Sequence, residues 1–338
     1  MAGKDYKPIL IDQLSILEKS ERQAKNLFKA RAYSKVLQEI KGIPGTIGSA
    51  DKERIAKLPG VGKKLEEKIR EIFETGELHQ AKDVENKSAF KIGNALLKIY
   101  GVGPVKAEEL IHKHDIRSLS ALRRRQEELL NEKQQIGLKY YDDINERIPR
   151  TEMKKHEKTL LTAMKTVDAR FKGEIVGSYR REAADSGDID FLVTIPKSTA
   201  SSKEITDAFQ RLIQYLMGGI EYVTDILAVG PKKFMGICRL GTGKARRLDI
   251  LLTPEEEYPY AVLYFTGSDK FNVGMRRGAL ELGYTMNEHG MKPTKKTGTG
   301  ENVPLPPIMA DEEDIFKFLG YKYVLPKNRT DASILIKK

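Results

Sequence analysis

The 338-residue chain carries a net charge of +11, from 59 Lys and Arg against 48 Asp and Glu, and has one cysteine, Cys238. A chain of this length can bury a core in more than one unit, so we expect two to four subdomains. The basic balance predicts a polyanionic partner such as nucleic acid, although a basic surface can also serve solubility alone. The single cysteine excludes an intramolecular disulfide and a cysteine-based zinc site, and we expect it to be a small core residue.

No apolar run approaches the ~20 residues that a membrane-spanning helix needs. The first residues, Met1 to Lys7, lack the apolar core of a signal peptide. We therefore expect a soluble, intracellular protein without a membrane partner.

The first half of the sequence has a helical pattern. Apolar residues recur at helical spacing over residues 9–40, with charged residues between them. The segment Gly42–Gly48, which contains Pro44, interrupts this pattern and predicts a loop.

Two similar glycine turns occur at residues 58–64 and 100–106, and their first glycines, Gly60 and Gly101, lie 41 residues apart. Each precedes a helical pattern, and the glycines permit a tight turn while the helix N-terminus directs free N–H groups outward. An ordinary connection between helices explains one such turn. Two copies flanked by lysines favour paired helix-hairpin-helix motifs, each of which binds a DNA phosphate without reading the sequence.

After residue 148 the pattern changes to strands alternating with helices. We expect strands over residues 174–176, 189–195, 234–240 and 247–252. Another boundary is expected near residues 255–259, followed by a smaller mixed unit with a loop rich in proline and glycine over residues 292–307.

Three acidic residues are candidates for metal binding. Asp188 and Asp190 flank one residue of a predicted strand, so their side chains should point the same way. An isolated pair of this kind can simply be solvated. However, Asp249 lies within an apolar run, where an unpaired charge is costly. Three carboxylates on neighbouring strands can hold two metals roughly 3.5–4 Å apart, and the backbone N–H groups of Gly177 and Ser178 would suit a phosphate.

The order of these motifs resembles that of the X-family DNA polymerases, and most closely the polymerase beta branch. The resemblance extends from about Ile9 to Arg329 and rests on both hairpins, Gly-Ser-Tyr-Arg-Arg, Gly-Asp-Ile-Asp, Arg-Leu-Asp-Ile and Tyr-Phe-Thr-Gly-Ser-Asp. It implies a multidomain α+β fold. The implied parts are a helical lyase-like domain (1–83), a DNA-binding subdomain (84–148), a nucleotidyltransferase palm with a mixed sheet (149–256) and a thumb-like nucleotide-selection subdomain (257–338).

By this resemblance, Asp188 and Asp190 bind two Mg²⁺ ions, which Mn²⁺ can replace, and Asp249 binds the catalytic metal and helps to deprotonate the primer 3′-hydroxyl. The residues expected to bind the incoming nucleotide are Arg147, Ser178, Arg181, Ser186, Gly187, Tyr264, Phe265, Gly267, Asp269 and Asn272. A solvated surface is the alternative for Arg147, Arg180 and Arg181, and a buried aromatic pair for Tyr264 and Phe265. Arg247 would join an ion-pair network that switches between open and closed forms.

The resemblance also implies a 5′-deoxyribose phosphate lyase, with Lys68 as the Schiff-base nucleophile. A solvated lysine is the alternative, because the charged sequence alone does not distinguish Lys68. The expected DNA contacts are Tyr33, Lys35, Gly60, Gly62, Lys64, Gly101, Gly103, Lys233, Arg247 and Arg276. The hairpins should bind Na⁺ or K⁺ through the backbone carbonyls of Leu58, Val61, Leu97, Ile99 and Val102.

The chain departs from the family pattern at five positions. In the lyase-like domain, Phe28 replaces a histidine, and Ala56 and Gln80 replace phosphate-binding lysines. Val273 replaces a lysine that packs on the templating base, and His289 replaces an aromatic residue beside Glu288. These changes predict a weaker grip on a 5′-phosphate and altered template placement.

The sequence thus predicts a monomeric repair polymerase that fills short gaps, with gapped or nicked DNA and dNTPs as partners and a repair ligase or scaffold protein as a further partner. The compartment would be the nucleus in a eukaryote and otherwise the cytoplasm or a virion. Two alternatives stay open: template-independent nucleotide addition, and a non-catalytic scaffold that binds DNA through its hairpins.

Overall fold

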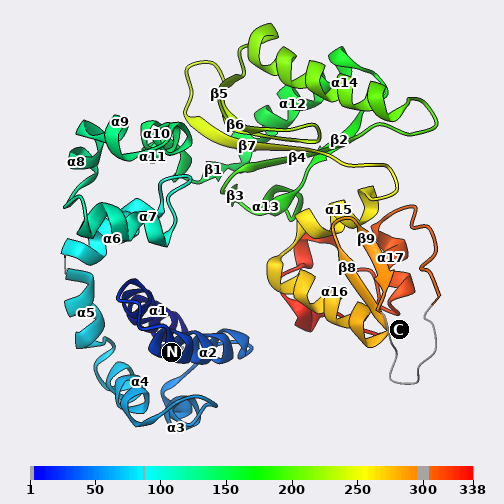
Figure 1. Cartoon of the computed structure of the whole chain (residues 1–338). Helices are drawn as coiled ribbons and strands as arrows, with labels where there is room; N and C mark the ends of the chain where they lie inside the picture. Colours follow the sequence, from blue (N-terminus) through cyan, green and yellow to red (C-terminus); the bar gives the residue numbers. More distant parts are fainter. Residues whose placement is uncertain (1–3, 87, 295–303, 338) are drawn as a thin grey trace. The chain divides into compact units, whose positions relative to one another are not determined.

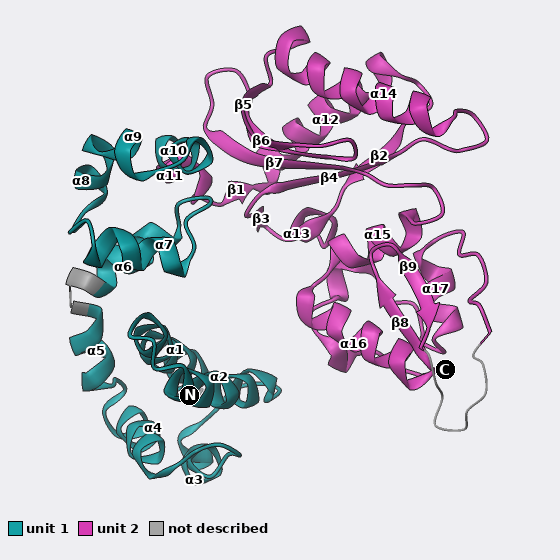
Figure 2. Cartoon of the chain, in the orientation of Figure 1, with its two compact units in different colours: residues 1–139 teal, residues 140–338 magenta. Residues whose placement is uncertain are grey.

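The computed structural model describes residues 4–86, 88–294 and 304–337 (Figure 1). Most of the predicted loop over residues 292–307 lies outside these ranges. The chain divides into two compact units, residues 1–139 and 140–338 (Figure 2). The three boundaries between the four predicted domains stay predictions. No described helix is long and apolar enough to cross a membrane.

Where the structure describes it, the first unit is built from helices. They are α1 (Lys7–Gln23), α2 (Leu27–Gly42), a 3₁₀ turn (Ser49–Asp51), α3 (Lys52–Ala56), α4 (Lys63–Thr75), α5 (His79–Asn86), α6 (Ser88–Leu97), α7 (Pro104–His112), α8 (Leu119–Arg124), α9 (Gln126–Leu129) and α10 (Glu132–Lys139). The helical pattern over residues 9–40 forms two helices, because the chain turns between α1 and α2, where Lys25 has a φ of 60°. Their apolar faces bury Leu10, Leu14 and Val36 in a core shared with Ile69 of α4.

The two glycine turns have the same backbone conformation. Val61 N donates to Leu58 O and Val102 N donates to Ile99 O, both at 3.0 Å. Gly60 has a φ of 96°. Its counterpart Gly101 has a φ of 80°, and both values favour glycine.

A helix follows each turn directly, and neither helix has a side-chain cap. The N-cap residues are Gly62 for α4 and Gly103 for α7, and neither has a side chain to accept a hydrogen bond from the first turn. The first backbone N–H groups of both helices therefore have no side-chain acceptor at the N-cap, which suits an anion.

The second unit contains the sheets. Its elements are α11 (Tyr141–Ile144), β1 (Ile148–Pro149), α12 (Arg150–Val167), β2 (Lys172–Ile175), α13 (Gly177–Arg180), β3 (Asp185–Ser186), β4 (Ile189–Thr194), α14 (Ser202–Gln214), a π turn (Tyr215–Gly219), β5 (Val223–Val229), β6 (Lys233–Arg239), β7 (Ala245–Leu252), α15 (Tyr258–Thr266), α16 (Asp269–Glu281), β8 (Tyr284–Asn287), β9 (Gly290–Pro293), α17 (Glu312–Phe318) and 3₁₀ turns at Pro326–Asn328 and Ala332–Ile334. All four predicted strands are confirmed within two residues at each end, and β5 was not predicted.

The main sheet has the strand order β2-β4-β7-β6-β5, with β4 and β7 parallel and the other pairs antiparallel. Helices α12 and α14 lie on one face, and α13 and α15 lie on the other (Figure 1). Phe191 and Ile250 pack on the α12 and α14 side, whereas Leu192 packs on Ala261 of α15. Side chains alternate along a strand, so Asp190 shares the α15 face with Leu192.

Cys238 is fully buried, as predicted, and lies near a buried polar network in this core. His156 is 0% exposed, and its Nδ1 lies 2.6 Å from the Tyr222 hydroxyl. Its Nε2 lies 3.5 Å from Glu152 Oε1. Burial lowers the pKa of His156 to about 4, which keeps the ring neutral at pH 7.

We expect the fold to lose stability between pH 6.5 and pH 4 because of His156. The unfolded imidazole binds a proton in this window and the folded one does not, so unfolding becomes easier as the pH falls, by about 2 kcal/mol at pH 5 and about 3 kcal/mol at pH 4. Urea unfolding at pH 7, 6 and 5 checks this. The His156→Gln variant, which cannot titrate there, should lose less stability than wild type over the same range. Equal losses in both proteins would contradict the prediction.

Candidate active site

The register of two parallel strands brings the predicted acidic residues together. Asp190 of β4 lies directly opposite Asp249 of β7. Asp188 precedes β4 and lines the same cavity as Asp190. The prediction that acidic residues on neighbouring strands meet is therefore confirmed for this pair.

These carboxylates carry more negative charge than their neighbours neutralise. Burial, together with the charges of Asp188 and Asp249, raises the pKa of Asp190 to about 7. Burial also raises the pKa of Asp249, whose Oδ1 atom has no hydrogen-bond partner among the described residues. Excess negative charge with an open oxygen is the condition that a divalent cation relieves.

Arg247 provides the nearest positive charge. Its Nη2 lies 2.9 Å from Asp188 Oδ2 and 3.4 Å from Asp249 Oδ2, so it bridges two of the three acids. In this arrangement the described residues contain no group of three or more metal-binding side chains at ligand spacing. The donor set suits hard cations, and Arg247 contacts only one oxygen of each of these two carboxylates.

The segment after β2 forms a phosphate-sized cradle beside the acids. Gly177 has a φ of 62°, and a Cβ there would lie 2.7 Å from Asp190 Oδ2, so a side chain is excluded. Ser178 Oγ donates to Ser186 Oγ at 3.0 Å. The expected helix α13 is a single turn, so hydroxyl and amide groups contribute more here than a helix dipole.

Two arginines line the cradle. Arg181 Nη1 donates to the Thr266 carbonyl oxygen at 2.5 Å, and no described carboxylate lies within ion-pair distance of Arg181. Arg147 is more exposed and pairs with Asp185 at 2.7 Å. Neither side chain is therefore simply solvated, and Arg181 has charge available for an anion.

These groups line a cavity of about 450 Å³. Its walls are Arg147, Gly177, Ser178, Arg181, Gly187, Asp188, Asp190, Tyr264, Phe265, Gly267, Ser268 and Asp269. Most of the predicted nucleotide contacts thus meet in one place. Sequence reasoning missed Ser268, whose Oγ donates to Thr330 O at 2.6 Å and accepts from Phe271 N to begin α16. Ser186 is buried behind Ser178, and Asp249 lies beyond the cavity wall.

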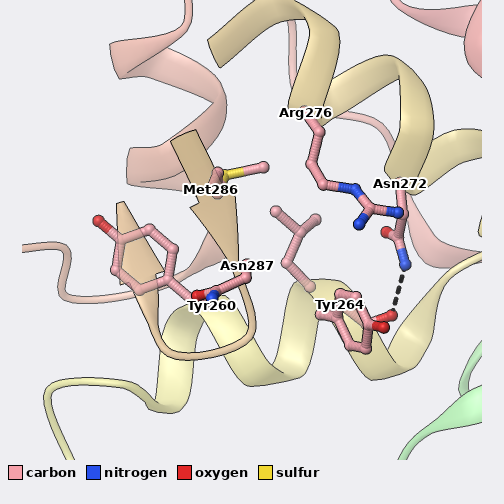
Figure 3. A pocket seen from close by; sticks show the side chains of 7 residues that line it. Tyr260, Tyr264, Asn272, Arg276, Met286 and Asn287 are labelled. Carbon is pink, nitrogen blue, oxygen red and sulfur yellow. Dashed lines mark hydrogen bonds between the residues drawn. The ribbon is translucent and has the colours of Figure 1, made fainter. Parts of the chain in front are cut away.

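Asn272 and Arg276 lie around a smaller pocket, which Tyr264 also lines (Figure 3). Asn272 Nδ2 donates to the Tyr264 carbonyl oxygen at 2.6 Å. The Arg276 guanidinium lies 5.9 Å from the Tyr264 ring centre, and Phe265 packs edge-on against that ring. Asn272 therefore fixes the backbone of Tyr264, and Arg276 and Phe265 lie beside its ring. Tyr264 and Phe265 are half-buried, so packing and a site role coexist.

A buried ion-pair cluster joins the phosphate cradle to α17. Glu312, only 6% exposed, accepts hydrogen bonds from Arg180 at 2.9 Å, Arg329 at 2.9 Å and Tyr323 at 2.8 Å. Burial opposes its ionisation, but the two guanidinium groups outweigh burial and hold the pKa at about 2. Arg180, for which a solvated surface was the alternative, is therefore a structural link. Sequence reasoning missed Glu312, and its place in an acidic helix start gave no sign of burial.

In the first unit, the predicted lyase residues lie near the first hairpin. Lys68 Nζ donates to Lys64 O at 3.2 Å. The stem of Lys35 lies over Gly60, where a Cβ would come 3.1 Å from Lys35 Cδ. Burial raises the pKa of the Tyr33 hydroxyl.

The five departures from the family pattern lie in different environments. Phe28 is 88% exposed and Gln80 is exposed, whereas Ala56 belongs to the core. Val273 is half-exposed on α16. His289 Nδ1 lies 2.7 Å from Glu257 Oε2.

Lys233 begins β6, two residues before Met235, which pairs with Asp249. Its positive charge favours the ionised form of Asp249, although burial of that carboxylate has the larger effect on its pKa. Whether Lys233 contacts DNA stays a prediction.

A mixed sheet that carries acids at adjoining strand positions, beside a cavity lined by two arginines and two serines, is the palm of a nucleotidyltransferase. Four family models match in order: a helix-hairpin-helix domain (residues 5–78), the fingers domain of DNA polymerase lambda (94–145), the DNA polymerase beta palm (147–255) and the DNA polymerase beta thumb (261–330). The chain therefore belongs to the X family of DNA polymerases.

Three relatives illustrate this membership. DNA polymerase lambda of Rattus norvegicus is 30% identical over 96% of this chain and 56% of its own length. The protein of that name from Arabidopsis thaliana is 29% identical over 88% of this chain and 57% of its own length. A DNA nucleotidylexotransferase of Xenopus laevis is 28% identical over 96% of this chain and 69% of its own length. The chain thus spans little more than half the length of the polymerase lambda relatives.

Proposed function

We propose that the chain is a DNA-directed DNA polymerase that fills short gaps during base excision repair. The observation that carries the proposal is the single cavity in which Asp188 and Asp190 face the Ser178 and Arg181 cradle and the Tyr264 to Gly267 segment. Nucleotidyl transfer requires carboxylates that bind cations, hydrogen-bond donors that bind a triphosphate and an aromatic side chain that packs against the sugar.

In this mechanism, Asp188, Asp190 and Asp249 would hold two divalent cations, Mg²⁺ or Mn²⁺. Such cations, when bound, neutralise charge on the attacking and leaving oxygens. Asp249 accepts the proton of the primer 3′-hydroxyl, for which its open Oδ1 and raised pKa are suited. The 3′-oxygen then bonds to the α-phosphorus as the bond to the bridging oxygen breaks and pyrophosphate leaves.

The remaining residues bind and orient the nucleotide. Ser178, Arg181 and Arg147 would bind the β- and γ-phosphates, and Tyr264 with Phe265 would crowd the 2′ position of the sugar. Because Tyr264 is held by Asn272 and Arg276, its ring forms a fixed wall, which favours deoxyribose over ribose.

The hairpins would hold DNA on either side of a gap. Their matching turns, and the helices without side-chain caps that follow them, suit phosphate binding. Backbone carbonyls of the Leu58 and Ile99 turns would bind a monovalent cation. Affinity for DNA should then fall steeply with salt. Repair activity would place the protein in the nucleus of a eukaryote, or otherwise in the cytoplasm or a virion.

Single-nucleotide extension on a duplex with a one-nucleotide gap, a 5′-phosphate and Mg²⁺ tests the proposal. Each dNTP is supplied in turn. Insertion of the complementary nucleotide alone supports a templated polymerase. Insertion of any nucleotide would instead indicate template-independent addition, the activity named in the Xenopus laevis relative. No insertion would leave a DNA-binding scaffold.

Replacing Lys68 by Ala should remove borohydride trapping of the protein on an abasic-site 5′-phosphate. The Lys68 amine would form an imine with the sugar aldehyde by losing water, and borohydride would reduce that imine to a stable amine. Gel analysis of the crosslink measures the trapped fraction. The Lys64→Ala variant is the matched control on the same helix and should still be trapped. Unchanged trapping of Lys68→Ala would place the nucleophile at another lysine, Lys64 or Lys35 first.

A further inference from the structure

Residues 143–146, which immediately precede Arg147, are fastened to the start of β7. Ala245 N donates to Asp143 Oδ2 at 2.9 Å, and Lys244 forms an ion pair with Glu146. Arg246 Nη1 donates to the carbonyl oxygens of Asp143 and Glu146, at 3.2 and 3.1 Å. The backbone position of the residue before Arg147 is thus set by one buried guanidinium.

Arg246 is itself held in place by Glu152. It is 1% exposed, and its Nε and Nη2 donate to the two oxygens of Glu152 at 2.7 and 2.9 Å. Glu152 lies in turn beside the buried ring of His156, at 3.5 Å. The planar guanidinium therefore uses one edge for the carboxylate and its other nitrogen for two backbone carbonyls, a pattern that lysine cannot reproduce.

The same strand carries this buried group and the candidate catalytic acid on opposite faces. Side chains alternate along β7, so Arg246 faces the α12 side, while Arg247 and Asp249 lie on the sheet face that carries Asp190. After the clamped segment, Arg147 enters the cavity wall. The Arg246–Glu152 clamp (Arg246, Glu152 and the carbonyls of Asp143 and Glu146) is the link that places Arg147 relative to β7.

We propose that Arg246 and Glu152 are positioning residues for the triphosphate, acting through Arg147. This inference rests on the proposed function, because it concerns the cavity that would bind the nucleotide. The clamp holds the backbone of Glu146, the residue before Arg147, while Asp185 holds the Arg147 side chain at 2.7 Å. Without the clamp, Arg147 becomes ordered only when the nucleotide binds. The conformational entropy lost in that ordering lowers the affinity for the nucleotide.

The double variant Arg246→Met/Glu152→Met separates positioning from stability. Replacing both members of a buried ion pair by apolar residues of similar size is often neutral for stability, but Met cannot donate to the two carbonyls. We expect the Kd for the complementary dNTP, measured on gapped DNA with a dideoxy-terminated primer, to rise about tenfold. With an extendable primer, KM should rise by a similar factor and kcat should stay unchanged.

A double-mutant cycle with Arg147→Ala tests the route of the effect. In the wild-type background Arg147→Ala should raise the Kd about tenfold, and in the clamp-free background it should add less than about twofold. Full additivity of the two changes would overturn action through Arg147. An unchanged Kd in a folded double variant would overturn the positioning role altogether.

The ion pair of Arg170 and Asp168 provides the matched control. Arg170 also binds one carboxylate through two nitrogens and donates to a backbone carbonyl, that of Thr199, but it lies between α12 and β2, outside the cavity lining. The double variant Arg170→Met/Asp168→Asn should leave the dNTP Kd unchanged. An equal rise in this control would mean that general loosening causes the effect.

The failure of the proposed function and the failure of this inference give different results. If wild type inserts no nucleotide on gapped DNA, the proposed function is wrong. If wild type inserts the nucleotide but the clamp variant has an unchanged dNTP Kd, only this inference is wrong.

Discussion

Replacing Asp249 by Ala is expected to reduce nucleotide incorporation by at least about 10³-fold, because the proposed mechanism uses Asp249 both as proton acceptor and as cation ligand. Affinity for gapped DNA should be nearly unchanged, since the Asp249 side chain is only 14% exposed. Single-turnover extension measures the first quantity and fluorescence anisotropy the second.

The same variant should fold at least as well as wild type. Asp249 contributes repulsion that raises the pKa of Asp190, and its Oδ1 has no partner among the described residues. Arg247 keeps its closer partner, Asp188, at 2.9 Å. Lost activity with an equal or higher thermal midpoint would therefore separate catalysis from folding.

Asp207 of α14 supplies the matched control for this experiment. It is an exposed carboxylate outside the cavity lining, so Asp207→Ala should incorporate nucleotides at the wild-type rate. Asp249→Asn, which keeps the shape and removes the charge, should resemble Asp249→Ala. Incorporation by Asp249→Ala at the wild-type rate would remove Asp249 from the proposed mechanism.

The acids were predictable because strand geometry is local and periodic. An aspartate inside an apolar run must sit on a strand whose other face is buried, and the parallel pairing of β4 with β7 then places Asp249 beside Asp190. The glycine turns were predictable for a similar reason, since the sequence around each glycine determines the turn. The order of the motifs then indicated which distant segments form one site, which periodicity alone does not show.

The elements that sequence reasoning missed depend on long-range contacts. Strand β5 pairs with β6 through two register irregularities, which break the alternation that reveals a strand. Arg246 and Glu312 look like ordinary surface charges in the sequence. Each is buried only because its partners, Glu152 for Arg246 and the distant Arg180 and Arg329 for Glu312, come from other elements.

Replacing Glu312 by Ala is expected to lower the free energy of unfolding by roughly 3–5 kcal/mol, because it leaves the buried Arg329 without its counter-charge. Arg180 keeps its second partner, Glu174, at 2.7 Å. Arg329 is 0% exposed and Arg180 is half-buried, so water cannot easily replace the lost carboxylate. Equilibrium urea unfolding measures the change. Glu313→Ala is the control, since Glu313 is an exposed neighbour in the same helix turn and should cost less than about 0.5 kcal/mol.

The pH dependence of this cluster distinguishes charge from packing. The folded pKa of Glu312 is about 2, below its usual value of 4.5, so its stabilisation is present above about pH 4.5 and is lost as the pH falls toward 2. Glu312→Gln keeps the size of the side chain but not its charge. The stability difference between wild type and Glu312→Gln should therefore shrink as the pH is lowered from 7 to 3. A difference that stays constant over this range would show that packing, and not the charge of Glu312, joins the phosphate cradle to α17.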